Sequence, residues 1–162
     1  MAGSTTKKVQ IWRFDREALS GFVNPTTYIT DSGVELLTLA GNVIVAKYSE
    51  VKAVVFVRDF DAAEDSTAVR RSFLSRPKLD GLWLRLTFRD GDVREAVMPN
   101  NLLHVEPLGF NLIPPETTQR LWVPREALIS VQVLGVIGVR AAAAARRPKP
   151  GAKDQIGLFE QA

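Results

Sequence analysis

The sequence predicts an all-β protein made of two small β-barrels in tandem. Short segments of alternating apolar and polar residues follow one another, and Gly, Pro, Asp and Asn recur between them. A helical periodicity is almost absent. Closed small barrels are a common arrangement for strands of this length and spacing. The chain of 162 residues is long enough for two very small domains, and its hydrophobic content of 46% supports packed cores.

Residues 9–60 are predicted to form the first barrel because they repeat the pattern of residues 81–139. The two stretches align at one constant offset up to Pro25, and at an offset two residues longer after it. The aligned pairs include Phe14–Phe88, Val23–Val97, Pro25–Pro99, Gly33–Gly109, Leu36–Leu112, Glu50–Glu126 and Val55–Val131. An alignment offset that stays nearly constant over both stretches favours duplication of one supersecondary unit. The alternative is a chance alignment of two β-rich segments.

Residues 61–80 are predicted to form a basic connector between the barrels. Asp61 and Glu64 fit a weak capping box, and Val69 and Phe73 lie one helical turn apart, so a short helix can form there. The basic residues of the connector are Arg70, Arg71, Arg76 and Lys78. We expect a solvated linker whose arginines bind nearby carboxylates.

Residues 81–139 are predicted to form the second barrel and carry the clearest strand pattern. Leu84, Leu86 and Phe88 alternate with polar residues at a period of two, which is typical of a half-buried strand. Asp90-Gly91 is a dipeptide preferred in two-residue hairpin turns. Further strands are expected at residues 93–97, 102–105, 110–113, 119–123 and 129–134.

Each barrel is expected to have a core of its own. The expected first core contains Phe14, Val23, Leu36, Val45 and Val55. The expected second core contains Leu84, Leu86, Phe88, Val97, Leu112, Val123 and Val131.

The layout of the second barrel resembles the Sm-like and SH3-like small barrels. The resemblance lies in the strand that ends at residues 88–91, the strand at residues 109–112 and the turn at residues 124–127. Sm-like proteins bind RNA through a loop with an acidic residue and an Asn, and through an Arg-Gly pair. Phe110-Asn111 stands near the first position, and the Arg-Gly pair is missing. The resemblance implies a barrel that binds RNA or single-stranded DNA, or an oligomeric scaffold whose barrels pair by strand edges.

The residue inventory argues against an enzyme, a metal centre or a cofactor. The chain has no cysteine and a single histidine, His104, in the apolar segment at residues 102–105. A general base needs a partner, and none is recognisable nearby. No phosphate-binding loop, dinucleotide fingerprint or zinc spacing is present. Because the start of the chain lacks the apolar segment of a signal peptide and no apolar run is long enough to span a bilayer, we expect a cytoplasmic protein with no membrane partner.

A candidate nucleic-acid surface follows from the same alternation. If the leucines of residues 82–88 and 121–123 point inward, aromatic and basic residues point outward between them. These candidate residues are Trp83, Arg85, Arg89, Arg120 and Trp122. Aromatic rings that stack on bases and arginines that contact phosphates are how proteins hold single strands. The favoured alternative is that the two tryptophans are buried between the barrels.

Residues 140–162 are predicted to be a flexible tail that carries a short linear motif. Residues 146–153 are basic and contain proline, which is typical of a linker. Gln155, Ile156, Leu158 and Phe159 resemble the bacterial sliding-clamp-binding motif, in which apolar anchors dock in a hydrophobic cleft of the clamp. The alternative is that these residues fold back over an apolar patch on a barrel.

The sequence therefore predicts a non-enzymatic adaptor that docks a partner protein through its tail, and the bacterial DNA sliding clamp is the best candidate. The alternatives are an RNA- or single-stranded-DNA-binding barrel protein and a homo-oligomeric scaffold. A net charge of +3 is compatible with nucleic acid without requiring it.

Overall fold

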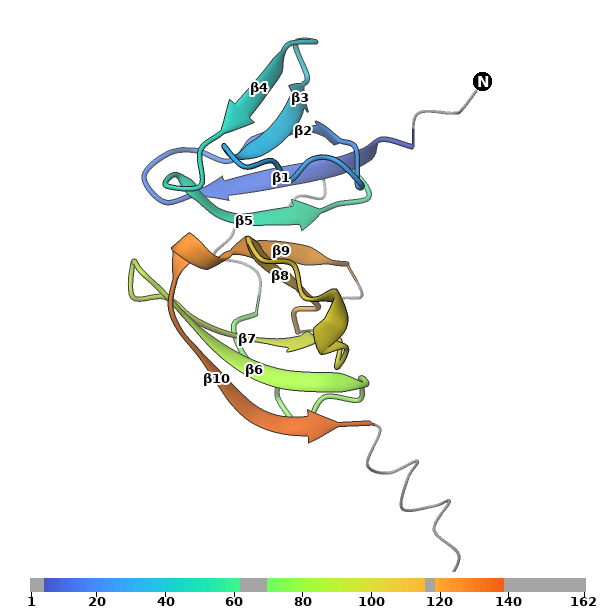
Figure 1. The fold of residues 1–162 in the computed structure, drawn as a ribbon, viewed down its shortest axis with the longest axis vertical. Helices are drawn as coiled ribbons and strands as arrows, with labels where there is room; N and C mark the ends of the chain where they lie inside the picture. The colour runs from blue at the N-terminus through green and yellow to red at the C-terminus, as the bar shows by residue number, and fades with distance from the viewer. Residues whose placement is uncertain (1–4, 62–69, 116–118, 139–162) are drawn as a thin grey trace, which may run out of the picture.

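The computed structural model describes residues 5–61, 70–115 and 119–138, and these residues form an all-β chain (Figure 1). The all-β prediction is confirmed. The strands are β1 (Lys7–Arg13), β2 (Leu19–Val23), β3 (Val34–Thr38), β4 (Val43–Ala46), β5 (Val51–Phe56), β6 (Gly81–Phe88), β7 (Val93–Met98), β8 (Gly109–Leu112), β9 (Leu121–Pro124) and β10 (Leu128–Ile137). Two 3₁₀ turns, η1 (Leu102–His104) and η2 (Arg125–Ala127), are the only helical elements in the described ranges.

The strands form two antiparallel sheets. One sheet has seven strands in the order β4-β3-β2-β1-β5-β9-β8, and the other has three in the order β10-β6-β7. An isolated bridge between Val97 and Ile113 links β7 to the residue after β8. Pairing among the described strands closes neither sheet into a barrel.

The larger sheet crosses from the first half of the chain to the second. Val54 of β5 pairs with Trp122 of β9, and Val55 pairs with Leu121. Figure 1 shows β5 and β9 side by side at the middle of the molecule. Successive side chains of a strand point to opposite faces, so β5 and β9 each supply residues to two cores.

The two cores are therefore not divided by sequence as we expected. The first cluster consists of Val9, Ile11, Val23, Tyr28, Val34, Leu36, Ala46, Tyr48, Val51, Val54 and Trp122. The second consists of Trp12, Ala53, Leu84, Leu86, Phe88, Ala96, Met98, Leu112, Leu121, Val123 and Ala127. Trp12 and Ala53 come from the first half, and Trp122 comes from the second. The crossover at β5 and β9 causes this exchange.

Five of the expected core residues lie outside the cluster in which we expected them. Val97 is buried, but it belongs to neither cluster. Phe14 and Val55, expected in the first core, pack against the second cluster. Val55 does so because its side chain lies on the face of β5 that meets this cluster. Val45 is 46% exposed and Val131 is 39% exposed. The last two lie on β4 and β10, which each pair with only one described strand and so receive no cover on their outer side.

The hairpin between β6 and β7 is one residue longer than Asp90-Gly91 alone predicts. Thr87 pairs with Val93, and the Phe88 N–H donates to the Asp92 carbonyl oxygen at 2.8 Å. Gly91 has a φ of 87°, a left-handed conformation that glycine adopts without strain. The loop is thus a three-residue turn with glycine at its last position.

The segment around His104 is not the strand that we predicted. Residues 102–104 form the 3₁₀ turn η1, and Leu102 and Leu103 are exposed. Pro99 and the two asparagines before this turn end β7, and the apolar run after them never joins a sheet. In the connector, residues 70–80 form no helix before β6, and residues 62–69 lie outside the described ranges. No helix in the described part of the chain is long and apolar enough to cross a bilayer.

Candidate functional site

The predicted clamp-binding residues lie beyond the described part of the chain. Gln155, Ile156, Leu158 and Phe159 all fall within residues 139–162, of which the structure describes none. Their role remains a sequence prediction.

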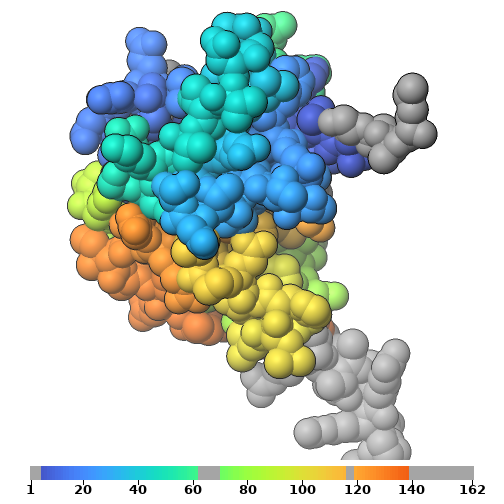
Figure 2. Space-filling view, turned by 45° about the horizontal axis from the view of Figure 1, so that its top comes forward, coloured from blue at the N-terminus to red at the C-terminus, as the bar shows by residue number. Residues whose placement is uncertain are grey.

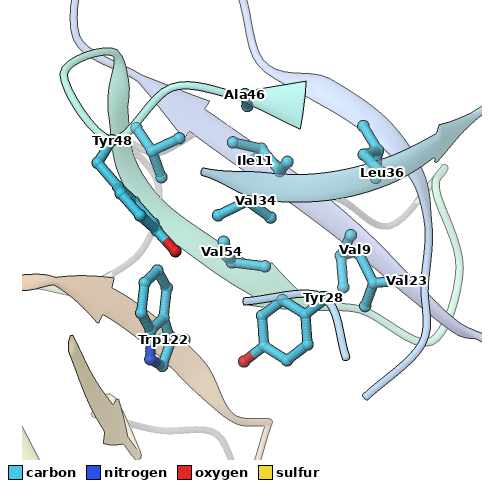
Figure 3. Close-up of a cluster of buried hydrophobic side chains, with 11 residues drawn as sticks. Val9, Ile11, Val23, Tyr28, Val34, Leu36, Ala46, Tyr48, Val54 and Trp122 are labelled. Atoms are coloured by element: carbon cyan, nitrogen blue, oxygen red, sulfur yellow. The ribbon is translucent and has the colours of Figure 1, made fainter. Parts of the chain in front are cut away.

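Trp122, one of the candidates for the nucleic-acid surface, is fully buried. Its indole lies among the side chains of the first cluster (Figure 3). The ring centroids of Tyr28 and Tyr48 lie 6.2 Å and 5.9 Å from it. Gly109 of β8 packs directly on the indole, because a Cβ atom there would lie 2.4 Å from the ring. Trp122 therefore fills the space between the halves and cannot stack on a base.

Trp83 and Arg85 both turn toward Glu95 of β7. The Trp83 Nε1–H donates to the Glu95 carboxylate at 3.1 Å, and the Phe73 backbone N–H donates to the same oxygen at 3.1 Å. A guanidinium nitrogen of Arg85 lies 3.8 Å from the other carboxylate oxygen. The Trp83 ring also meets the Phe73 ring edge to face at 6.5 Å. These contacts fasten the connector to the sheet of β6 and β7.

Arg89 and Arg120 lie at two further places. The Arg89 guanidinium stacks over the Phe14 ring at 4.0 Å and donates to the Ser49 carbonyl oxygen, so it joins the β6–β7 turn to the first half. Arg120 is exposed and lines a pocket near η1. The five residues of the predicted surface are thus not brought together on one open face.

A charge network surrounds Asp92 in the β6–β7 turn. Lys52 of β5 lies 2.7 Å from Asp90 and 3.0 Å from Asp92. Arg94 and Arg71 contact the two Asp92 oxygens at 2.7 Å and 2.8 Å. The contact of Arg71 with Asp92 agrees with our expectation that connector arginines bind nearby carboxylates.

This network holds the pKa of Asp92 low. Partial burial raises that pKa, but hydrogen bonds from Arg94 and Lys52 outweigh burial and lower it to about 2. The pKa of Asp90 is lowered in the same way, against the opposing effect of burial, chiefly by its hydrogen bond to Lys52. Both carboxylates therefore stay ionised and paired near neutral pH. Their ion pairs with Lys52 link the β6–β7 turn of the second half to β5 of the first half.

A basic groove of about 680 Å³ lies where the connector meets the end of β5 and the loop after β8. Arg58, Arg76 and Lys78 line it, together with apolar walls from Phe73 and from residues 114–115. The described residues of its lining include no carboxylate. Arg76 is held in place by a 2.9 Å hydrogen bond to the Val136 carbonyl oxygen. The groove is suited to an anion that also presents flat or apolar groups.

Only part of this groove was visible in the sequence. Arg76 and Lys78 belong to the segment that we recognised as basic, but Arg58 follows β5 and the proline pair follows β8. No periodicity or motif places these three segments side by side. The signal that could have pointed to the site is the cluster of cations in the connector.

A model of the DUF6982 family, described as a family of unknown function, matches residues 5–135. The chain belongs to the DUF6982 family. No curated protein and no solved structure matches the chain. The DUF6982 match includes every described residue that lines the basic groove and stops short of the predicted clamp-binding peptide.

A smaller, mostly apolar pocket of about 260 Å³ also lies within the DUF6982 match. Met98, Phe110 and Leu112 line it, and His104, Glu106 and Arg120 are its charged or titratable members. Glu106 also lines a neighbouring hollow with Tyr28, at the contact between the two halves that Figure 2 shows in yellow and blue. Burial, followed by the negative charge of Glu106, raises the pKa of the Tyr28 hydroxyl. The described residues contain no cluster of metal-ligating side chains.

Proposed function

We propose that the chain is a non-enzymatic adaptor that docks a partner protein through residues 155–159, and that the bacterial DNA sliding clamp is the best candidate. The observation that carries the proposal is the peptide Gln155-Ile156-Gly157-Leu158-Phe159, in which every position fits the clamp-binding motif. Leu158 and Phe159 are apolar anchors, and Gln155 can hydrogen-bond the rim of a cleft. Buried apolar and aromatic anchors carry most of the binding energy in small contacts of this kind.

The described residues support this proposal because they form two packed clusters of their own. Both buried clusters draw all their described members from residues 9–128. The family match ends at residue 135, before the motif begins. Docking of a short peptide costs conformational entropy, so we expect a modest affinity.

Titration of a synthetic peptide of residues 153–162 against the sliding clamp tests the proposal. Isothermal calorimetry should detect binding of the peptide and of the full chain, and no binding of a chain truncated before Asp154. A peptide with the same residues in scrambled order is the control. Equal binding by the full and truncated chains would show that the peptide is not the docking element.

We further infer that the folded body is a pair of tandem small barrels, of the Sm-like or SH3-like kind, that arose by duplication. The first five strands follow the order β4-β3-β2-β1-β5. The corresponding strands of the second half follow the same order, β9-β8-β7-β6-β10, when the Val97–Ile113 bridge is counted between β8 and β7. Five strands placed alike in both halves favour duplication over chance.

The second candidate function is binding of single-stranded nucleic acid in the basic groove. Arg58, Arg76 and Lys78 line the groove with no carboxylate among the described lining residues, and Phe73 supplies an aromatic wall. Phosphates pair with such cations, and bases stack on such rings. Fluorescence anisotropy with labelled single-stranded DNA and RNA at several salt concentrations tests it. Failure to bind even at low salt would exclude this function.

A further inference from the structure

Two strand edges remain unpaired at opposite ends of the molecule. Among the described residues, β4 pairs only with β3, and β10 pairs only with β6. Figure 1 shows β4 and β10 far apart along the long axis. An unpaired edge presents a row of free backbone donors and acceptors to any other strand.

Both edges are apolar and exposed. On β4, Val43 and Val45 are exposed, and on the ten-residue strand β10 so are Ile129, Val131, Val133 and Val136. Neither strand contains a charged residue or a proline, the groups that usually protect an edge from pairing. Exposed apolar surface of this kind marks an interaction site.

A strand pairing equivalent to one between β10 and β4 already exists within the chain. Within the chain, β5 pairs with β9. By strand order, β10 occupies in the second half the place of β5 in the first, and β4 occupies in the first half the place of β9 in the second. The edges left over at the two ends are thus the counterparts of the edges joined in the middle.

The register identifies the equivalent residues on β5 and β10. β5 shifts register against β1 between Val51 and Ala53, near the start of the strand. β10 shifts twice against β6, and the shift near its start lies between Leu128 and Ser130. Superposing these two irregularities makes Val131 the counterpart of Val54. This is one residue from the Val55–Val131 pair of the sequence alignment.

The hairpins identify the equivalent residues on β4 and β9. Leu36 pairs with Ile44, and Leu112 pairs with Leu121. Because Leu36 aligns with Leu112, Ile44 corresponds to Leu121, and the next residue, Val45, corresponds to Trp122. Val54 and Trp122 are paired and fully buried, whereas their counterparts Val131 and Val45 are exposed.

We propose that β10 of one copy pairs antiparallel with β4 of a second copy, so that Val131 lies opposite Val45 as Val54 lies opposite Trp122 within the chain. The contact explains why two residues whose pattern places them in a core are exposed in the single chain. It joins different surfaces of the two copies, so each pair leaves one free β4 and one free β10. Such a head-to-tail contact continues into a ring or a filament. This inference rests on the equivalence of the two halves and does not depend on docking through residues 155–159.

Two single variants and their mixture test the head-to-tail geometry. Val45→Lys disables β4 and leaves β10 intact, and Val131→Lys does the reverse. Multi-angle light scattering over a range of concentrations should find the wild type in assemblies larger than a dimer, and each variant alone as a monomer. An equimolar mixture of the two variants should stop at a dimer, because only one productive contact remains. Leu103→Lys, at a 94% exposed residue outside both edges, is the control and should assemble like the wild type.

Other outcomes would overturn the proposal. A wild type that is monomeric at every concentration overturns the proposal for the full chain. If a chain truncated after Gly138 then assembles, residues 139–162 occupy the β10 edge in place of a second copy. If Val131→Lys blocks assembly while Val45→Lys does not, two copies of β10 pair with each other instead. Unchanged circular dichroism of both variants is required and expected, because both side chains are solvent-exposed in the single chain.

Because the chain has no cysteine, a crosslink can test the register directly. A mixture of the Val45→Cys and Val131→Cys variants should form a disulfide-linked dimer under mild oxidation. Replacing Val131→Cys by Val136→Cys should reduce the yield several-fold, and equal yields would contradict the proposed register.

Discussion

Val54 of β5 pairs with Trp122 of β9, and both side chains are completely buried in the same cluster. The two residues come from different halves of the chain, so this pair makes the interior continuous across them. Stability of one half should therefore depend on the other, and we expect a single cooperative unfolding transition.

Trp122→Ala should lower the free energy of unfolding by about 3–5 kcal/mol, because it removes a large buried side chain and leaves a cavity. Urea denaturation followed by circular dichroism measures this. Trp122→Phe should cost less, since a ring remains against Tyr28 and the buried Nε1–H, which has no partner among the described residues, is removed. An effect of Trp122→Ala no larger than that of Trp83→Ala, at a half-buried site, would contradict this packing role.

Gly109→Ala should destabilise the protein by about 1–3 kcal/mol, because overpacking forces the surroundings to shift. The added Cβ would lie 2.4 Å from the Trp122 ring and 2.6 Å from the Val123 carbonyl oxygen. Gly135→Ala is the matched control, since the nearest atom there is 4.0 Å away. Equal melting temperatures for the two variants would argue against close packing of β8 on the indole.

Stability should fall as the pH drops from about 4 toward 2. The pKa of Asp92 is lowered to about 2 in the folded chain, and an unfolded aspartate has a pKa of about 3.9. Its contribution is therefore present above pH ~4 and is lost as the folded carboxylate becomes protonated. Asp92→Asn should flatten this part of the urea midpoint profile. Asp59→Asn, at an exposed carboxylate, should leave it unchanged.

Removal of either apolar anchor should weaken binding to the sliding clamp. Phe159→Ala and Leu158→Ala should each reduce affinity by on the order of 2 kcal/mol or more. Gln155→Ala should weaken binding by leaving a hydrogen bond unmade. Calorimetry with the full chain measures each effect, and Glu160→Ala, just outside the motif, is the control. An affinity for the clamp that neither Phe159→Ala nor Leu158→Ala changes would exclude this docking mode.

Arg58→Ala should weaken binding of single-stranded DNA uniformly across sequences and reduce the slope of log affinity against log salt by about 1. Arg16→Ala removes the same charge from an exposed loop outside the groove and should matter less. Arg85→Ala separates the groove from the surface predicted by strand alternation. A larger effect of Arg85→Ala than of Arg58→Ala would favour that surface.

The sequence by itself determined the all-β class and most strand positions. A period of two in residues such as Leu84, Leu86 and Phe88 is a local signal, and so is the glycine turn after Asp90. The charge of the connector was also visible, because composition alone reveals it. The resemblance of residues 155–159 to a clamp-binding motif rests on the sequence alone.

The tertiary structure alone decided which core each residue enters. Alternation indicates that Trp122 and Val123 point to opposite faces of β9, but it does not predict that each face packs against a core. That depends on β5 pairing with β9, a contact between residues far apart in the chain. The same long-range pairing decides that Val54 is buried, whereas Val131 is exposed, and only the tertiary structure places Arg58 and Lys78 in one groove. Local patterns specify strands and faces, whereas strand pairing across the chain specifies what each face meets.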